Sequence, residues 1–449
     1  MTFFSRAFST AADLPLDDHL IGQCVVVNYR PRESETFTRS YVYEALFRTP
    51  RYGPAENRLL NNFVYCEAEF AVNVLDDLRH VRGIYYCQQN GLTSVCAHAS
   101  IRMAVNTLRP EQRFIDNASV SAVVGQVNPD GLTPDEVKQV IEACSDLDVQ
   151  VVGCDQLSSS NYLSILASTA ESGGVALLVF SVELRRGEEP VISSSETGID
   201  ARSLHTVVSF GTTVNSDEWH PHAIRHYAGA ESAKYAPSSS WVDHLVIHDD
   251  NFGPYFTLSS RALEVDPNVR ATHIIIIRNE PCKILAHAVE AFASKVLVYL
   301  LPTISDQSDG IWFSKVVHNE AEFVMRPVLV SYDDYLEHLA SAVGHNGARM
   351  NSENLSCLNG LPPLFWMVEF SVPDLFTGNK SKLGEILVGV EVVPQEGNPP
   401  APPFLAARLP GLICIALSAE ERPGALAVSK CDLDSHSPIY RKSPHDHEW

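Results

Sequence analysis

The chain has 449 residues, 45% of them hydrophobic, so it is long enough to bury more than one core. Its 55 acidic residues outnumber 33 basic residues, and the formal net charge is −22. Nucleic acids and anionic membranes attract clustered Lys and Arg, so this balance argues against both as main partners. We expect a protein or peptide substrate, since a basic or unstructured polypeptide suits the acidic field.

The pattern of apolar residues and cysteines favours a cytoplasmic protein. No stretch of eighteen or more consecutive apolar residues is present, and the N-terminus lacks the continuous apolar segment of a secretory signal. Ten cysteines are dispersed without CxxC pairs or metal-ligand spacing, which is typical of reduced, mostly buried thiols. We expect no membrane span, no metal and no cofactor, and the sequence does not indicate an oligomeric state.

The chain begins with a strand-rich region and then becomes helical. Residues 1–80 are predicted to form a β-rich N-terminal extension, because strand-like runs such as residues 23–29 alternate with turns that contain Pro and Arg. Between residues 110 and 172 the apolar spacing is helical, and Thr133 followed by Pro134 marks one helix start.

Cys96 stands at the start of a predicted helix between these two regions. Apolar residues recur after it at the spacing of one buried helix face. With Thr93 or Ser94 as the cap, Cys96 lies in the first turn, where unpaired backbone N–H groups and the helix dipole favour the reactive thiolate. An amide from residues 88–90 can reach the site and donate to a developing oxyanion.

Two predicted strands supply a histidine and an acid. A buried strand over residues 175–182 and a polar excursion, either a flap or a solvated hairpin, lead to His205, which opens a β-branched run. The next strand, residues 244–248, is followed at once by Asp249 and Asp250. An acid beside a histidine strand can hold the imidazole in one tautomer, as in a Cys-His-Asp triad.

This order of Cys on a helix, His on a strand and Asp after the next strand resembles the papain-like cysteine peptidase superfamily. The resemblance is closest to the compact bacterial branch that includes the bacteriocin-leader peptidases, and it covers residues 81–278. It implies an α+β papain-like domain in which an antiparallel sheet bears the His and the Asp. It also implies four roles: nucleophile Cys96, general base His205, orienting acid Asp249 or Asp250, and oxyanion amide Gln89.

Three hypotheses about function follow from the resemblance. The first is a thiol hydrolase that cleaves a peptide or isopeptide bond through a thioacyl intermediate, with Asp249 preferred over Asp250 because it directly follows the apolar strand. The second keeps the triad but transfers the acyl group, as a transglutaminase or amidase does. The third is a catalytically inactive scaffold that binds a protein, because Ala97 and His98 follow the cysteine where the bacterial branch has Gly and Pro.

The second half of the chain carries no motif for a named chemistry. Residues 279–431 are predicted to form a separate α+β domain, with a mixed helix and strand pattern over residues 284–301, and residues 432–449 are predicted to be disordered. Histidines 220, 222 and 226 could suggest a metal site. Pro221 separates the first two and no Cys or carboxylate stands at a matching spacing, so we expect a solvated loop.

Overall fold

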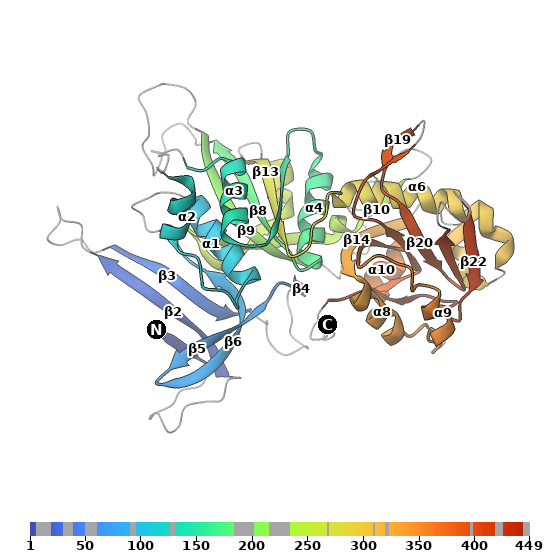
Figure 1. The fold of residues 1–449 in the computed structure, drawn as a ribbon, viewed down its shortest axis with the longest axis horizontal. Helices are drawn as coiled ribbons and strands as arrows, with labels where there is room; N and C mark the ends of the chain where they lie inside the picture. The colour runs from blue at the N-terminus through green and yellow to red at the C-terminus, as the bar shows by residue number, and fades with distance from the viewer. Residues whose placement is uncertain are drawn as a thin grey trace. The chain divides into compact units, whose positions relative to one another are not determined.

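The computed structural model describes residues 1–5, 19–29, 39–49, 61–89, 96–125, 131–183, 202–214, 234–266, 269–308, 310–318, 323–345, 347–395, 398–417 and 425–442. The chain forms two compact units (Figure 1). Unit 1 comprises residues 1–157, 173–213 and 243–280, and unit 2 comprises residues 158–172, 214–242 and 281–449. Residues 158–172 therefore lie in unit 2, although they fall inside the region that resembles a peptidase.

A five-stranded antiparallel sheet occupies the first part of unit 1. Its strands are β1 (Thr2–Phe4), β2 (Leu20–Tyr29), β3 (Arg39–Arg48), β5 (Ala68–Val74) and β6 (Asp77–Tyr86), in the order β1-β2-β3-β6-β5. The hairpin between β5 and β6 turns through Leu75 and Asp76, which both have positive φ, as a tight primed turn requires. Every second residue of β5 is buried, the alternation of a half-buried strand.

Three helices follow this sheet in unit 1: α1 (Cys96–Leu108), α2 (Asn117–Val124) and α3 (Pro134–Cys144). The predicted start of α3 is confirmed, since the Thr133 side chain and Glu136 form a capping box. The prediction for α1 was incomplete. Residues 97–108 are all buried, not only those of one apolar face, because the helix also takes part in polar contacts within the core. Arg102, for example, donates to the Tyr85 hydroxyl at 3.1 Å.

The second sheet of unit 1 has the order β12-β11-β9-β8-β13-β7, with β4 (Asn61–Val64) paired to β9. These strands are β7 (Asp148–Gly153), β8 (Val175–Glu183), β9 (Arg202–Val214), β11 (Val242–Asp249), β12 (Gly253–Ser259) and β13 (Val269–Arg278), and α5 (Ser260–Val265) joins the last two. Strands β8 and β9, and likewise β11 and β12, pair antiparallel. In this order β9, which bears His205, lies directly beside β11, which ends in Asp249.

Unit 2 is built on a seven-stranded sheet in the order β10-β14-β15-β17-β20-β21-β22. These strands are β10 (Tyr235–Pro237), β14 (Phe323–Ser331), β15 (Leu364–Ser371), β17 (Gly384–Val388), β20 (Phe404–Leu409), β21 (Leu412–Ala416) and β22 (Leu426–Lys430). Alternate residues of β15 enter two different apolar clusters, so both faces of the sheet are covered: Trp366 and Val368 in one, Phe365 and Met367 in the other. The whole chain is thus a mixed α+β protein with several antiparallel sheets, as predicted.

The helices of unit 2 are α4 (Ser159–Glu171), α6 (Ala286–Ile304), α7 (Ile311–His318), α8 (Tyr332–Ser341), α9 (Ser352–Ser356) and α10 (Pro373–Asn379). The mixed pattern predicted for residues 284–301 was wrong, because this segment is the single long helix α6, which runs beside the sheet in Figure 1. By length and composition α6 could cross a membrane. In this structure Val289, Leu297 and Leu301 pack into the core of unit 2.

The prediction of disorder from residue 432 onward was wrong as far as residue 442. Strand β23 (Ser437–Pro438) pairs with β16 (Ser381–Lys382), and a further hairpin joins β18 (Val393–Gln395) to β19 (Asn398–Ala401). The carbonyl of Tyr440 accepts from Arg326, and its N–H donates to Glu369. These contacts with charged groups hold a segment whose polar composition resembles that of a disordered tail.

Candidate functional site

The residues singled out by the sequence converge at one end of the second sheet of unit 1. Cys96 is the first residue of α1 and is half-buried, whereas the twelve residues after it are buried. His205 lies near the start of β9, and its side chain retains 17% exposure. Asp249 is the last residue of β11, the strand beside β9. Two sheet neighbours and one helix start therefore supply the three groups.

His205 has Asp249 and Cys96 as neighbours. Its Nε2 lies 3.1 Å from Oδ2 of Asp249. Cys96 is near enough to the imidazole to favour its charged form. The Phe180 ring from β8 packs edge-on against the imidazole with centroids 5.5 Å apart, which restricts its rotation.

Both aspartates of the predicted acidic turn face His205. The Asp250 carboxylate lies 3.8 Å from the same Nε2, beyond hydrogen-bonding distance. Consecutive residues of a regular strand point to opposite faces, but β11 ends at Asp249 and Asp250 lies in the turn that follows. The two adjacent acids can therefore approach one imidazole. The geometry favours Asp249 as the hydrogen-bonded partner.

The electrostatics of the cluster favour a charged imidazole and a charged Asp249. Burial opposes the imidazolium, but the hydrogen bonds and charges of Asp249 and Cys96 outweigh it and raise the pKa of His205 to about 10. Burial likewise opposes ionisation of Asp249, yet His205 and the backbone N–H groups of Asn251 and Phe252 hold its pKa below the usual range. No other residue that the structure describes donates a hydrogen bond to the Asp250 carboxylate, and burial raises its pKa to about 6.

The amides before Cys96 have different environments. The Gln88 side chain accepts from the backbone N–H of Val42 at 2.8 Å, so it belongs to the first sheet. Gln89 Nε2 donates to Oδ1 of Asn251 at 3.0 Å, which places Gln89 beside the acidic turn. Of the two described amides before Cys96, Gln89 is therefore the one whose side chain bonds a residue of the acidic turn. Asn90, the predicted caps Thr93 and Ser94, the excursion over residues 184–201 and the loop histidines lie outside the described residues.

An aromatic cage that no sequence pattern indicates supports the acidic turn. His248 is fully buried, and the rings of Tyr86, Phe210 and Tyr255 pack edge-on against it at 4.5–5.3 Å. The Tyr86 hydroxyl also donates to the carbonyl of Asp249 at 3.2 Å. Burial lowers the pKa of His248 to about 3, so this imidazole is neutral. The position of His248, one residue before Asp249, is a local signal for the centre of the cage, but the rings that pack against it come from three other strands.

Comparison with known proteins assigns no function to this site. No protein-family model matches the chain, and a search of curated proteins finds no significant match. The arrangement can deprotonate a thiol, hold the resulting ion pair and orient the base, which are the requirements of nucleophilic catalysis. His205, Asp249 and Asp250 also offer donor types that bind a metal ion.

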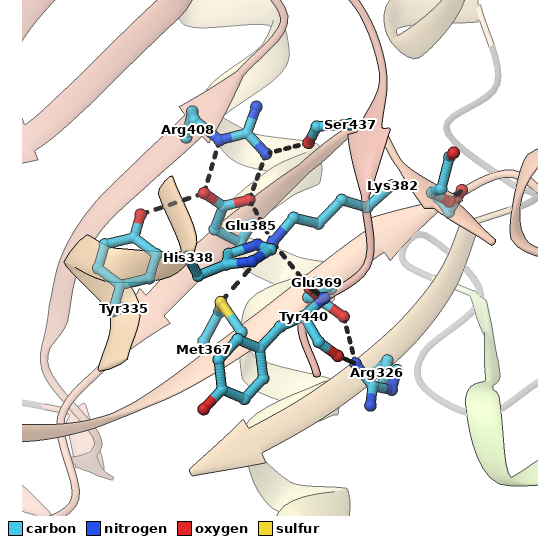
Figure 2. A network of polar contacts seen from close by, with 12 residues as sticks. Arg326, Tyr335, His338, Met367, Glu369, Lys382, Glu385, Arg408, Ser437 and Tyr440 are labelled. Atoms are coloured by element: carbon cyan, nitrogen blue, oxygen red, sulfur yellow. Dashed lines mark hydrogen bonds and ion pairs between the residues drawn. The ribbon is translucent and has the colours of Figure 1, made fainter. Parts of the chain in front are cut away.

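A second cluster of charged residues lies inside unit 2 (Figure 2). Lys382 is fully buried and contacts Glu369 at 2.7 Å and Glu385 at 3.2 Å. Arg408 forms a two-point ion pair with Glu385, and Arg326 bonds Glu369 at 2.6 Å. Each carboxylate therefore faces at least two cations. Because these charges are paired with one another and excluded from water, we interpret the cluster as a structural ion network.

Proposed function

We propose that the protein is a papain-like thiol hydrolase that cleaves a peptide or isopeptide bond in a polypeptide substrate. The observation that carries the proposal is the placement of Cys96 beside His205, whose imidazole is hydrogen-bonded to Asp249. A thiol, an imidazole and a buried carboxylate in this order are the groups that such a reaction uses. We place this activity in the cytoplasm, as the dispersed free thiols suggest.

In the proposed reaction, the Cys96 thiolate attacks the carbonyl carbon of the scissile bond while His205 carries the proton. The carbonyl electrons move to oxygen, and this oxyanion accepts hydrogen bonds from the Gln89 amide and the Cys96 backbone N–H. When the tetrahedral intermediate collapses, His205 protonates the leaving amine and a thioester remains. Water, deprotonated by His205, then attacks the thioester and releases the acid. Asp249 keeps the imidazole oriented throughout.

The residues after the cysteine are compatible with this role. Ala97 and His98, where the chain departs from the bacterial branch, are only 6% and 2% exposed. The departure therefore falls on the packed interior of α1, whereas Cys96 remains accessible. We infer that it alters how the helix fits the core and does not remove the nucleophile.

Alkylation of the cysteines tests the proposal without a known substrate. The full-length protein is treated with iodoacetamide over a pH series, and the modification of each cysteine is followed by peptide mass spectrometry. Cys144 and Cys357 are matched controls, because they are half-buried like Cys96. We expect Cys96 to react at pH 6.5 at least tenfold faster than either control, since an ordinary thiol ionises near pH 8.5. The His205→Ala variant should lose this advantage.

A reactive ester separates a catalyst from a merely reactive thiol. With p-nitrophenyl acetate, attack by Cys96 releases p-nitrophenolate in a burst and leaves an acetyl thioester on a peptide that mass spectrometry identifies. An added amine that receives the acetyl group faster than water would favour the transferase alternative. Uniform, slow alkylation of all ten cysteines together with no burst would refute the proposal and favour an inactive scaffold.

A further inference from the structure

The three side chains that surround Nε2 of His205 have the spacing of metal ligands. The nitrogen lies 3.1 Å from Asp249 Oδ2 and 3.8 Å from Asp250 Oδ1, and one donor atom of each residue lies within 4.8 Å of the others. Zinc–ligand bonds of about 2.0–2.2 Å in a tetrahedron imply ligand separations of roughly 3.3–3.6 Å. The two measured separations bracket that range, so an ion fits with small side-chain movements.

Asp250 provides an independent reason to expect an ion. Its side chain is 0% exposed, yet neither carboxylate oxygen has a hydrogen-bond partner on another residue that the structure describes. Among the same residues, His205 is the cation that pairs with either aspartate. A buried carboxylate without donors is costly, and binding a cation is one of the ways in which proteins compensate for it.

The remaining contacts of these ligands match those of residues that hold a metal. Oδ1 of Asp249 accepts the backbone N–H groups of Asn251 at 2.8 Å and Phe252 at 3.2 Å, which leaves Oδ2 directed at the imidazole. Such bonds orient a ligating carboxylate. The Phe180 ring packs edge-on against the imidazole, which restrains the ring as well.

We propose that His205, Asp249 and Asp250 bind one Zn²⁺ ion, with water in the fourth position. We favour zinc because one imidazole nitrogen and two carboxylate oxygens suit it, and because three protein donors are fewer than the six to eight oxygen ligands that Ca²⁺ takes. The expectation of no metal rested on the cysteines and the loop histidines, and adjacent aspartates with a distant histidine have no ligand spacing along the chain that would reveal this site.

Zn²⁺ at this site would block catalysis, an effect that rests on the proposed function. The ion would take the Nε2 lone pair, displace the proton shared with Asp249 and prevent His205 from serving as a base. Zinc would therefore inhibit the hydrolase reversibly. The metal site itself does not depend on the proposed function, because Zn²⁺ binding is measured without a substrate.

The binding test uses the full-length protein and Zn²⁺ in competition with a chromogenic chelator. We expect one Zn²⁺ per chain at this site and a loss of affinity greater than tenfold in Asp250→Asn, which keeps the shape of the side chain. Asp155→Asn, which changes an exposed carboxylate elsewhere in unit 1, should bind like the wild type. Cys96→Ser should also keep its affinity, because the sulfur is not a ligand.

Co²⁺ in place of Zn²⁺ provides a second readout on the unaltered protein. We expect visible d–d absorption without a thiolate-to-metal charge-transfer band, and alkylation of Cys96 at least tenfold slower with metal than without. Equal affinity of Asp250→Asn and wild type, or a strong thiolate band, would overturn the proposal in favour of simple Cys–His binding. If Asp250→Asn fails to fold, the Co²⁺ spectrum decides. Zn²⁺ binding with ordinary Cys96 reactivity would refute the proposed function alone.

Discussion

Replacement of Lys382 tests whether the ion network of unit 2 stabilises the fold. The ammonium group is fully buried and lies between Glu369 and Glu385. Lys382→Met keeps the length of the side chain and removes the charge. Arg326, Lys382 and Arg408 balance Glu171, Glu369 and Glu385 in the wild type, so the variant leaves one uncompensated negative charge in the interior.

The expected loss follows from what remains after the replacement. Breaking a buried ion pair costs about 3–5 kcal/mol. Each carboxylate keeps an arginine, with Glu369 bonded to Arg326 and Glu385 to Arg408. We therefore expect the lower end, about 3 kcal/mol, which corresponds to a fall in Tm of about 6–12 °C for a unit of this size. Differential scanning calorimetry measures it, because the two units can unfold in separate transitions.

The chain offers a matched control and a compensating variant. Lys283 pairs with Glu391 at 3.0 Å, but their side chains are 74% and 68% exposed, so Lys283→Met should cost about 0–1 kcal/mol. Adding Glu385→Gln to Lys382→Met restores charge balance and should recover part of the loss. A fall in Tm for Lys382→Met no larger than that of the control would refute the reasoning.

Three further predictions concern pH, packing and the triad. Burial raises the pKa of Glu290 to about 8, so the stability that the neutral carboxyl contributes is fully present below pH 4.5 and is lost as the pH rises toward 8. Glu290→Gln should therefore be more stable than the wild type toward urea at pH 8, by at most about 5 kcal/mol. At pH 4 the variant should have no such advantage. Gly83→Ala would press a methyl group into the carbonyl oxygen of Phe47 and should lower Tm by several degrees, whereas Gly153→Ala meets nothing within 4 Å and should leave Tm unchanged within error. Asp249→Asn removes the charge that orients the base, so the alkylation of Cys96 at pH 6.5 should slow at least tenfold while the Tm of unit 1 changes little; an unaltered rate would exclude the assigned role.

The cage around His248 explains why part of the site escaped the sequence analysis. His248 and Asp249 are neighbours in the sequence, but the cage residues Tyr86, Phe210 and Tyr255 belong to β6, β9 and β12. No local pattern connects these positions. The contacts arise only when strands of the two sheets of unit 1 pack together.

Local chemistry was enough to predict several elements of the protein. The apolar spacing after Cys96, the Thr-Pro start of α3 and the β-branched runs of β9 and β11 are local signals, and the structure has these elements where they were expected. They depend on backbone propensities and on the period of apolar residues, both of which are written in neighbouring residues. The mixed α+β class follows from the same signals.

Tertiary structure decided the features that depend on distant residues. Strand β11 ends at Asp249, and the turn that follows places Asp250 near His205 as well, whereas a continued strand would have separated the two acids. The order of the segment around Tyr440 depends on Glu369 and Arg326, which lie 71 and 114 residues earlier in the chain. The spacing of apolar residues along the sequence predicts which residues are buried, but the pairing of distant segments determines which charged groups come together in the interior.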